Sequence, residues 1–411
     1  MLRAYKYRLL PNPDQTELLE KHFGCARHVY NWALDERQKS YAETGKSLPM
    51  RQFFDALVVS KKTDRPWLAE VNSQSLQIAL RNLDDAYQRF FRKEARFPRF
   101  KSKSAGWQSF QCPQHVKVDF ENNRISLPKI RGIRAFLHRE FEGQIKTVTI
   151  KRSPTGKFTA NVLVDDGRDL PAAPPVEASK VLGLDVGSNH YLIDSDGNKT
   201  DNPKYLRAAL RRLATEQRKL SRKRKGSSNR RKQKLAVARV HEKVANQRND
   251  FIHQLTALLV DKNHATGFAV ENLNVKGMIR NKKLARTIAD CAWSRFVETL
   301  RYKCDWFGKN LLMIDRFAPS SKTCSCCGHR MGKLPLSIRN WSCPVCKTEH
   351  DRDINAAVNI KQFAIADALG QSACVKSSPV TPHVSACVTA KGTGSNSQFG
   401  SQEAPTTTGT V

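Results

Sequence analysis

Four cysteines in the C-terminal third of the chain have the spacing of a metal site. The pattern is Cys324-x-x-Cys327, fifteen further residues, and then Cys343-x-x-Cys346. Two such knuckles match a tetrahedral zinc site of the zinc-ribbon kind, because each tight turn points two sulfurs at one ion. Four thiolates leave no coordination position for water, so the spacing predicts a structural Zn²⁺. An iron–sulfur cluster or a redox-active dithiol is the alternative, and the fifth thiol, Cys326, is expected to point away.

Two acids lie in apolar segments that are typical of buried strands. Asp185 lies within VLGLDVG, residues 181–187, and Glu271 ends FAVE, residues 268–271. A buried aspartate is costly unless it is paired or binds metal. Together with an acid on a later helix, these carboxylates could hold Mg²⁺, and two ions about 3.5–4 Å apart would suit phosphodiester hydrolysis. Taken singly, Asp185 could instead form a turn and Glu271 could be a solvated acid at a strand end.

The third acid can be chosen by helical geometry. If a helix begins near residue 352, Asp353 shares a face with Ala357, Ile360 and Ala364. This face is apolar after the acid, so it is expected to pack on the sheet and carry Asp353 toward it. Asp351 lies just before the helix and is expected to be its N-cap, accepting hydrogen bonds from backbone N–H groups.

The composition of the whole chain points to a polyanionic partner. The 411 residues carry a formal charge of +32, which is self-repulsive unless an anion offsets it. No apolar run approaches the ~20 residues that would span a bilayer, and the start, MLRAYKYRLLPNPDQ, lacks the apolar core of a signal peptide. Uneven clustering of the cysteines favours metal binding in a reducing cytoplasm. Nucleic acid is therefore the expected partner, in a cytoplasmic, nucleoid-associated protein; a supercharged soluble protein is the alternative.

The N-terminal segment is expected to be a strand followed by helices. Residues 1–10 alternate as a strand, and Asn12 can cap a helix that has Pro13 in its first turn. Two further helices are predicted from apolar stripes, so residues 11–95 should be mostly helical. The stripes are Ala26, Val29, Tyr30, Ala33 and Leu34, and then Leu76, Ala79, Leu80, Leu83, Tyr87, Phe90 and Phe91.

Short strands follow the helices. The segment RFPRFKSKSAGWQSF, residues 96–110, mixes basic and aromatic side chains, which suits a nucleic-acid strand or, alternatively, a loop whose rings join a core. HVKVDF, RISLP, KTVTIKR and FTANVLV, within residues 115–165, are typical of strands. A small β-barrel or sheet with the helices inserted after its first strand is predicted. The proline-rich segment DLPAAPPVEASK, residues 169–180, is expected to be a linker.

A basic hairpin and a polar tail complete the chain. Residues 204–250 hold 17 Lys or Arg against three acids, and helical apolar stripes flank the break KGSSN. This pattern predicts a helical hairpin that contacts nucleic acid, although a charge run is often only a solvated face. From Leu369 onward, 22 of 43 residues are Gly, Ser, Thr or Pro, so the tail is expected to be disordered.

Several motifs in a fixed order resemble the TnpB (OrfB) family. They are GLDVG, ENL, the paired Cys-x-x-Cys knuckles and HDRDxNAA, and the stretches RLLPNPDQ, ARHVYNWAL, FPRFKSK and ENLNVKGMIRNKKLARTIADCAW are also similar to that family. These are transposon-encoded, RNA-guided nucleases with a RuvC-like domain, similar to type V CRISPR effectors. The resemblance covers residues 1 to about 367.

The resemblance implies an α+β multidomain protein with an RNase H-like (RuvC) α/β catalytic domain. Its triad would be Asp185, Glu271 and Asp353 with two Mg²⁺ ions, and its inserted zinc ribbon would hold a structural Zn²⁺. An N-terminal β-barrel wedge domain would carry the inserted helical bundle. The implied divisions are a wedge domain at 1–10 and 96–170, a helical recognition domain at 11–95, a linker at 171–180, a nuclease domain at 181–320 and 348–367, a zinc ribbon at 321–347 and a tail at 368–411.

The same resemblance implies a guide RNA derived from the transposon end and a double-stranded DNA target. The protein is expected to read a short adjacent motif as duplex, while base pairing reads the rest. Ser73, Gln74 and Gln77 resemble motif contacts by position, and only Gln77 matches by identity, so the preferred motif stays open. The further expected contacts with nucleic acid are Gln111, Arg99, Lys101, Lys103, Trp107, Arg211, Arg222, Lys223, Arg224 and Lys276.

A segment after Glu271 is expected to form a mobile lid that carries Lys276, Lys282 and Lys283. Two other functions are weighed against guided cleavage. A guided repressor that no longer cuts is disfavoured because all three acids are present. An unguided transposase or structure-specific nuclease is disfavoured by the basic surface outside the catalytic region. The sequence shows no apolar stripe, apart from those expected in the cores, that could form a self-complementary dimer interface. A monomer is therefore favoured, and the oligomeric state stays open.

Overall fold

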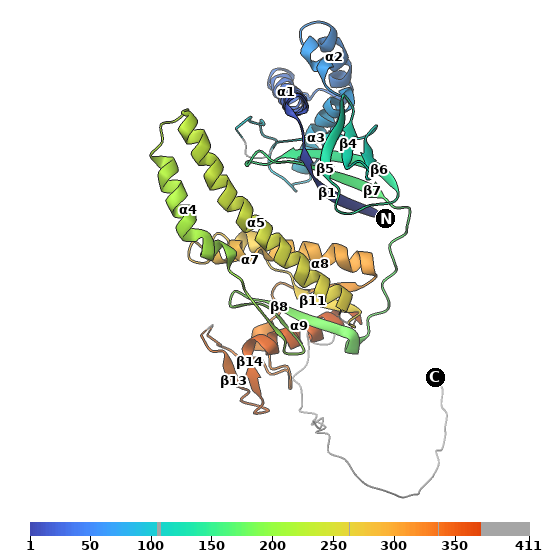
Figure 1. Cartoon of the computed structure of the whole chain (residues 1–411). Coiled ribbons are helices and arrows are strands. Elements are labelled where there is room, and N and C mark those ends of the chain that lie inside the picture. Colours follow the sequence, from blue (N-terminus) through green and yellow to red (C-terminus); the bar gives the residue numbers. More distant parts are fainter. Residues whose placement is uncertain (105–107, 263, 336, 371–411) are drawn as a thin grey trace, which may run out of the picture.

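The computed structural model of the chain describes residues 1–104, 108–262, 264–335 and 337–370. Trp107 and the predicted disordered tail from residue 371 onward therefore lie outside the described residues. Two large parts are visible, one formed by the N-terminal strands and helices and one by the later strands, with a long helical hairpin beside them (Figure 1). Each part has its own hydrophobic core.

The N-terminal part is built on a seven-stranded antiparallel sheet of order β2-β6-β7-β1-β5-β4-β3. Its strands are β1 Leu2–Leu10, β2 Gln108–Cys112, β3 Lys117–Asp119, β4 Arg124–Leu127, β5 Ile130–Phe136, β6 Gln144–Arg152 and β7 Phe158–Asp165. β2 and β5 were not among the predicted strands. The hydrogen-bond ladder ends at β2 and at β3 within the described residues, so closure of the sheet into a barrel stays a prediction.

Three α-helices are inserted between β1 and β2, as predicted. They are α1 Pro13–Thr44, α2 Met50–Lys62 and α3 Ser73–Phe91, with a short 3-10 turn at Pro66–Glu70. Asn12 and Gln15 form a capping box at the start of α1, which confirms the predicted cap. The two helices predicted within residues 13–44 are one helix, because the glycine between them, Gly24, costs only about 1 kcal/mol and does not break a helix. The α3 stripe ends at Tyr87, since Phe91 is 71% exposed.

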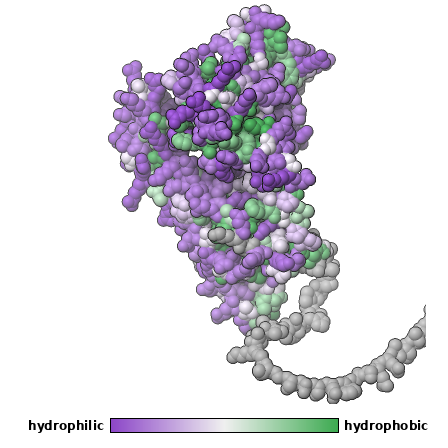
Figure 2. Space-filling view, turned by 45° about the vertical axis from the view of Figure 1, so that its right-hand side comes forward, coloured by the Kyte–Doolittle hydropathy of each residue, from purple (hydrophilic) through white to green (hydrophobic). Residues whose placement is uncertain are grey.

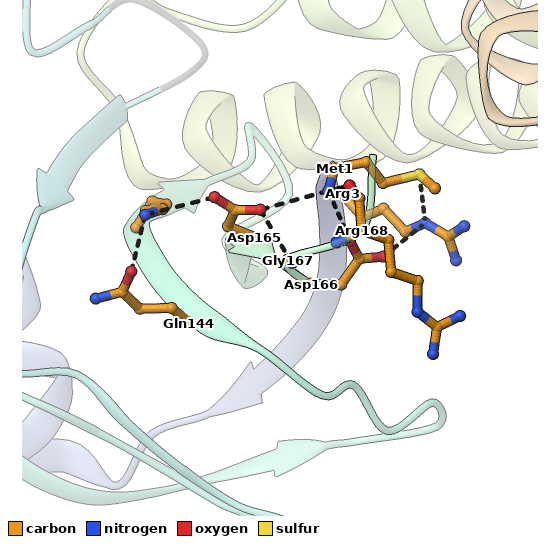
Figure 3. A network of polar contacts seen from close by, with 8 residues as sticks. Met1, Arg3, Gln144, Asp165, Asp166, Gly167 and Arg168 are labelled. Atoms are coloured by element: carbon orange, nitrogen blue, oxygen red, sulfur yellow. Dashed lines mark hydrogen bonds and ion pairs between the residues drawn. The ribbon is translucent and has the colours of Figure 1, made fainter. Parts of the chain in front are cut away.

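The N-terminal amine fixes the end of this sheet (Figure 3). It donates to the carboxylates of Asp165 and Asp166 and to the carbonyl of Arg168, just beyond β7. Arg3 on β1 adds an ion pair to Asp166 at 3.6 Å. The first and last strands of the part are thereby joined at the point where the chain enters the predicted linker.

The second part is built on a five-stranded sheet of order β10-β9-β8-β11-β12. Its strands are β8 Val181–Val186, β9 His190–Asp194, β10 Lys199–Asp201, β11 Gly267–Glu271 and β12 Asn310–Ile314. β8, β11 and β12 run parallel, and β9 is antiparallel to β8. The helices are α4 Tyr205–Ser221, α5 Ser228–Lys262, α6 Val275–Met278, α7 Ala285–Cys291, α8 Trp293–Phe307 and α9 Arg352–Ala368.

Helices cover both faces of this sheet (Figure 1). Phe268 and Val270 of β11 join a core formed with α5 and α8, whereas Ala269 joins the core on the α9 face. Because side chains alternate along a strand, Glu271 follows Ala269 onto the α9 face. Gly183 of β8 also lies on that face, against α9, so Asp185 two residues later shares it. Strand alternation therefore brings both strand acids to the helix that carries Asp353.

Helix α9 approaches β8 so closely that only a glycine fits at position 183. A Cβ atom there would lie 2.0 Å from the carbonyl oxygen of Ala357 and 2.9 Å from the Lys361 side chain. Ala357, Ile360 and Ala364 are buried, which confirms the predicted apolar face of this helix. The glycine thus sets the distance between the strand and the helix at the position where their acids meet.

The predicted basic hairpin is confirmed as α4 and α5, and α5 continues twelve residues beyond the predicted end at residue 250. The hairpin tip projects away from both sheets (Figure 1). Glu242 on α5 bonds Thr155 at 2.8 Å and Lys157 at 2.7 Å, so the hairpin also touches the N-terminal sheet. The face in Figure 2 is largely hydrophilic with small apolar patches. No helix of the described residues has the length and apolarity to span a membrane.

Candidate metal centres and nucleic-acid surface

Asp185 and Glu271 lie at the carboxyl ends of two adjacent parallel strands. The register pairs Leu184 with Val270, so the next residue on each strand is one of the two acids. Asp353 lies in the first turn of α9, the helix that packs on β8. The three acids that the sequence singled out therefore come from three separate elements and meet at one edge of the sheet.

The charges of the three acids influence one another. The pKa of Asp185 is raised to about 8, first by burial and then by the negative charges of Glu271 and Asp353. The positive charge of Arg352 and the backbone N–H of Val186 oppose this shift without cancelling it. The edge is consequently a concentrated negative site within a chain of strongly positive net charge.

Two neighbouring side chains hold the other carboxylates. The Ser320 hydroxyl donates to Glu271 Oε1 at 2.6 Å, and Arg339 Nη1 donates to Asp353 Oδ1 at 3.1 Å. Both partners belong to the segment between β12 and α9, which also carries the cysteines. Sequence reasoning missed both residues, because no local spacing links a serine or an arginine to an acid elsewhere in the chain.

Buried asparagines anchor α9 to the start of the cysteine segment. Asn355 donates to the Thr323 carbonyl at 2.8 Å and accepts from the Ser325 N–H at 2.9 Å. Asn359 donates to the carbonyls of Ser320 and Thr323. Ser320 in turn donates to Glu271. Helix α9, which carries Asp353, is thereby linked through Ser320 to Glu271. The asparagine of HDRDxNAA was the one signal in the sequence for this anchor.

Asp351 is the N-cap of α9, as predicted. Its Oδ1 accepts from the N–H groups of Asp353 at 2.9 Å and Ile354 at 3.1 Å. Its other oxygen pairs with Lys199 Nζ at 2.6 Å. Both carboxylate oxygens of Asp351 therefore have partners within the protein: two backbone N–H groups at the start of α9, and Lys199.

The donors at the sheet edge fit a divalent cation. Carboxylate oxygens are the ligands that Mg²⁺ prefers, and a cation would relieve the repulsion that adds to burial in raising the pKa of Asp185. The three carboxylates are not drawn into one cluster, however. Among the described residues, the four cysteines are the only group of three or more acid, cysteine or histidine side chains whose ligand atoms all lie within 4.8 Å of one another. Glu271 and Asp353 instead accept hydrogen bonds from Ser320 and Arg339.

The four cysteine side chains of the predicted zinc site lie close together. The Sγ atoms of Cys324, Cys327, Cys343 and Cys346 lie within 4.8 Å of one another, and two pairs are 3.6 Å apart. Tetrahedral zinc with Zn–S bonds of ~2.3 Å needs sulfurs about 3.8 Å apart, so the four thiols fit that ion. Cys326 is exposed and outside the group, as predicted.

A small ribbon core supports the cysteines. β13 Asn340–Ser342 pairs with β14 Glu349–Asp351, and Trp341 packs against His350 with ring centroids 4.7 Å apart. His350 Nε2 also lies 3.0 Å from Cys324 Sγ. Trp341 and Leu334 are buried with Cys324 in this core, which is separate from the cores of the two sheets.

A pocket of about 480 Å³ lies between α1, α3, the loop at residues 100–102 and β2. Two predicted contacts with nucleic acid, Lys101 and Gln111, line it. Gln111 accepts from the Asn82 amide at 3.3 Å, and Lys101 Nζ lies 3.7 Å from the centroid of the Tyr30 ring. Polar groups of strand β2 and of the inserted helices α1 and α3 therefore line the same pocket.

The other predicted contacts that the structure describes, which exclude Trp107, do not line this pocket. On the first turn of α3, Ser73 accepts from Lys61 Nζ at 2.8 Å, and Gln74 donates to Gln114 at 2.9 Å. Gln77 is half-buried on the same helix. The remaining predicted residues are exposed in the loop before β2, on the hairpin or in α6: Arg99, Lys103, Arg211, Arg222, Lys223, Arg224 and Lys276.

Three family profiles match the chain. A profile of the OrfB type, described as "Probable transposase", matches residues 160–282; a "Cas12f1-like, TNB domain" matches 293–360; and a helix-turn-helix domain matches 1–46. Within residues 1–46 the structure has β1 and the single long helix α1. The profiles therefore span both parts of the molecule and the cysteine segment.

Two bacterial proteins are similar over most of the chain. One from Streptomyces pristinaespiralis, named "Putative RNA-guided DNA endonuclease", is 39% identical over 90% of each chain. Another from Escherichia coli K12, "Putative RNA-guided DNA endonuclease InsQ", is 34% identical over 87% of this chain and 91% of that one. A solved Cas12f1–sgRNA–target DNA complex has a similar fold, with a TM-score of 0.54 at 15% identity over 85% of this chain and 83% of that one.

Proposed function

Because the chain belongs to the TnpB (OrfB) family of transposon-encoded, RNA-guided DNA endonucleases, we propose that Asp185, Glu271 and Asp353 form its DNA-cleaving centre. The observation that carries this proposal is their convergence at one sheet edge, where burial and then the negative charges of Glu271 and Asp353 raise the pKa of Asp185. Such a group of acids is unfavourable in a folded protein unless a cation uses it.

The fold supports the same proposal. Three parallel strands with an antiparallel hairpin at one edge and helices on both faces suit an RNase H-like (RuvC) nuclease domain. In this division the five-stranded sheet, its helices and α9 form the nuclease domain, and the cysteine segment is a zinc ribbon inserted before α9. The seven-stranded sheet is the wedge domain, the inserted helices α1–α3 are the recognition domain, and the segment before β8 is the linker.

Each residue of the centre has a role in the proposed reaction. Asp185 and Asp353 would hold the divalent ions, and Glu271 would complete the set of oxygen donors. When bound, a pair of Mg²⁺ ions supplies charge stabilisation to the attacking and leaving oxygens of phosphodiester hydrolysis. Ser320 orients the Glu271 carboxylate, while the Arg339 guanidinium keeps Asp353 turned toward the ribbon.

The basic surfaces account for the proposed partners. The hairpin carries 17 Lys or Arg and only three acids over residues 204–250. It would hold the guide RNA by its phosphates. The 480 Å³ pocket beside α3 is the proposed place where an adjacent DNA motif is read, since it offers the Asn82, Gln111 and Arg27 side chains together. Base pairing with the guide would then select the rest of the target.

Two other functions make different predictions. A guided repressor would bind the same RNA and DNA without cutting, and an unguided nuclease would cut without a defined RNA. Sequencing the RNA that copurifies with the chain, then assaying cleavage of matching and mismatched DNA with Mg²⁺, separates the three. Guided cleavage requires one defined RNA and cuts only in matching DNA. Random RNA, or cutting that ignores the match, would overturn the proposal.

A further inference from the structure

A second pocket, of about 500 Å³, lies between the start of the hairpin and the segment after Glu271. Five cations line it: Lys204, Arg207, Lys282, Lys283 and Arg286. Within the described part of the chain, none of the five has an ion pair to an acid within 4 Å. Like charges gathered in this way repel each other, so the pocket favours an anion.

The one acid that lines the pocket is already engaged. Asp290 is buried, and its carboxylate accepts from the N–H groups of Leu206 at 2.9 Å and Arg207 at 3.1 Å. It also pairs with Arg248 Nε on α5 at 3.2 Å. Asp290 therefore fixes the first turn of α4 against α7 and so connects two walls of the pocket. The five cations of the pocket have no ion pair to this carboxylate.

One of the five cations is held in a strained backbone conformation. Lys204 has φ 49° and ψ 46°, in the left-handed region, where a non-glycine residue costs roughly 1–2 kcal/mol. The Asn202 side chain accepts from its backbone N–H at 3.1 Å. The strain is maintained at a half-buried residue that lines this pocket.

The pocket borders the proposed cleavage centre. Ser188 and Asn189, which line it, follow Asp185 by three and four residues in the loop between β8 and β9. Its other wall, residues 282–290, is reached from Glu271 through the short helix α6. Both walls thus continue from the two strands that carry the proposed catalytic acids.

The lining also indicates which part of a nucleic acid would enter. No aromatic side chain is among the residues that line this pocket, so it offers no surface for base stacking. It offers cations together with the hydroxyls of Ser188 and Thr287 and the amide of Asn189, which suit phosphate oxygens. The expected contact is therefore with the backbone and is independent of sequence.

We propose that this pocket binds the phosphodiester backbone of the single DNA strand that is about to be cut, and delivers that strand to Asp185, Glu271 and Asp353. This inference rests on the proposed function for the identity of the strand. A guide-RNA backbone would present the same chemistry, so the two sources must be separated by experiment.

The test measures binding of a short fluorescent oligothymidylate to the RNA-loaded protein in EDTA, over a range of salt concentrations. The pocket variant is Lys282→Gln/Lys283→Gln/Arg286→Gln. The control, Lys46→Gln/Lys62→Gln/Lys117→Gln, removes three exposed lysines of the N-terminal part. Each phosphate contact with a single strand contributes ~0.7 to the slope of log K against log salt, so the pocket variant should lower that slope by about 2. The control should leave it unchanged.

The opposite wall gives an independent check, in which Lys204→Gln/Arg207→Gln should lower the slope by about 1.4. Copurifying guide RNA is quantified for every variant and should stay at the wild-type amount. Equal slopes for the pocket and control variants would overturn the proposal, and loss of guide RNA from the pocket variant would assign the pocket to the guide. Because no cleavage is required, a wild-type chain that never cuts DNA would refute the proposed function without deciding this test.

Discussion

The segment between β12 and α9 carries the cysteine site and contacts the acid site, and the two candidate metal sites are built in opposite ways. The four cysteines come from one stretch of 23 residues, Cys324 to Cys346, and their sulfurs already lie within 4.8 Å of one another. The three acids come from two strands and a helix, and burial, together with the negative charges of Glu271 and Asp353, raises the pKa of Asp185 to about 8. The first arrangement favours folding around an ion, whereas the second stores repulsion at a place where chemistry is proposed.

This difference teaches how stability and activity are divided in the molecule. A closed thiolate site contributes to folding when zinc binds, because the unfolded chain has no preformed site. A group of buried acids costs folding energy until a cation neutralises it. Ser320 and Arg339 connect the two sites, since both residues come from the cysteine segment or its approach and bind the acids. Variants at the two sites should therefore change stability in opposite directions.

The largest expected change in stability is at the cysteine site. Cys343→Ser removes one of four zinc ligands, and structural zinc binding supplies roughly 10–16 kcal/mol in small zinc domains, so the ribbon should lose its fold at ordinary zinc concentrations. Zinc content and the near-ultraviolet circular dichroism of Trp341 report this loss. Cys326→Ser is the matched control and should keep both signals. A ribbon that stays folded without zinc would remove the contrast between the sites.

Gly183→Ala tests the close approach that brings the acids together. The new Cβ would meet the Ala357 carbonyl oxygen at 2.0 Å, so α9 must shift, at a cost of about 1–3 kcal/mol. Denaturant unfolding measures this cost. The same change at Gly332, where nothing lies within 4 Å of a new Cβ, is the control. Equal stability of the two variants would show that α9 does not pack on β8 as described.

Asp185→Asn should instead stabilise the metal-free protein at pH 8 by about 1 kcal/mol or more, since one pKa unit corresponds to ~1.4 kcal/mol. The folded-state pKa of about 8 lies above the ordinary aspartate value of 3.8, so the folded state keeps a proton that the unfolded state releases between these values. The free energy of unfolding of the wild type should consequently fall as pH rises from about 4 to 8.

The variant should lose this part of the pH dependence. Thermal unfolding in EDTA at several pH values measures it, with Asp169→Asn in the exposed linker as the control. A wild type whose stability rises through the same pH window, after subtraction of the control, would contradict the repulsion among the three acids.

Ser320→Ala should have the smallest effect. It removes one hydrogen bond to a carboxylate, so Glu271 loses its orientation and cleavage slows by about fivefold to tenfold, corresponding to about 1 kcal/mol. The neighbouring Ser321→Ala is the control. An unchanged cleavage rate in Ser320→Ala would show that the hydroxyl does not position Glu271 for the reaction.

Sequence reasoning reached the cysteine site more directly than the acid site. Local spacing was sufficient for Cys324, Cys327, Cys343 and Cys346, because two tight turns place the sulfurs. For the acids, apolar periodicity identified the two strands and the buried face of α9, and the N-cap role of Asp351 followed from its place before the helix. What brings the acids together, the parallel register and the glycine at 183, depends on contacts between distant segments.

Other features were missed for related reasons. Strand β5 carries three arginines or glycines among its seven residues, which weakens its apolar alternation. Helix α1 was predicted as two helices, because its N-terminal cap and its apolar stripe gave two separate signals, whereas one helix is buried along most of its length. Ser320, Arg339 and Asp290 have no sequence signature, because each acts through a partner that is 14 or more residues away or lies in a different element.

The most direct test of the central claim compares the two aspartates that stand two residues apart. Asp353→Ala and Asp351→Asn are each loaded with the copurifying guide RNA and assayed for cleavage of matching DNA with Mg²⁺. Asp353→Ala should cut at least about a thousandfold more slowly, since loss of metal stabilisation costs several kcal/mol, while RNA binding and zinc content stay normal. Asp351→Asn keeps a capping side chain and should cut at nearly the wild-type rate. Undiminished cutting by Asp353→Ala would contradict the account.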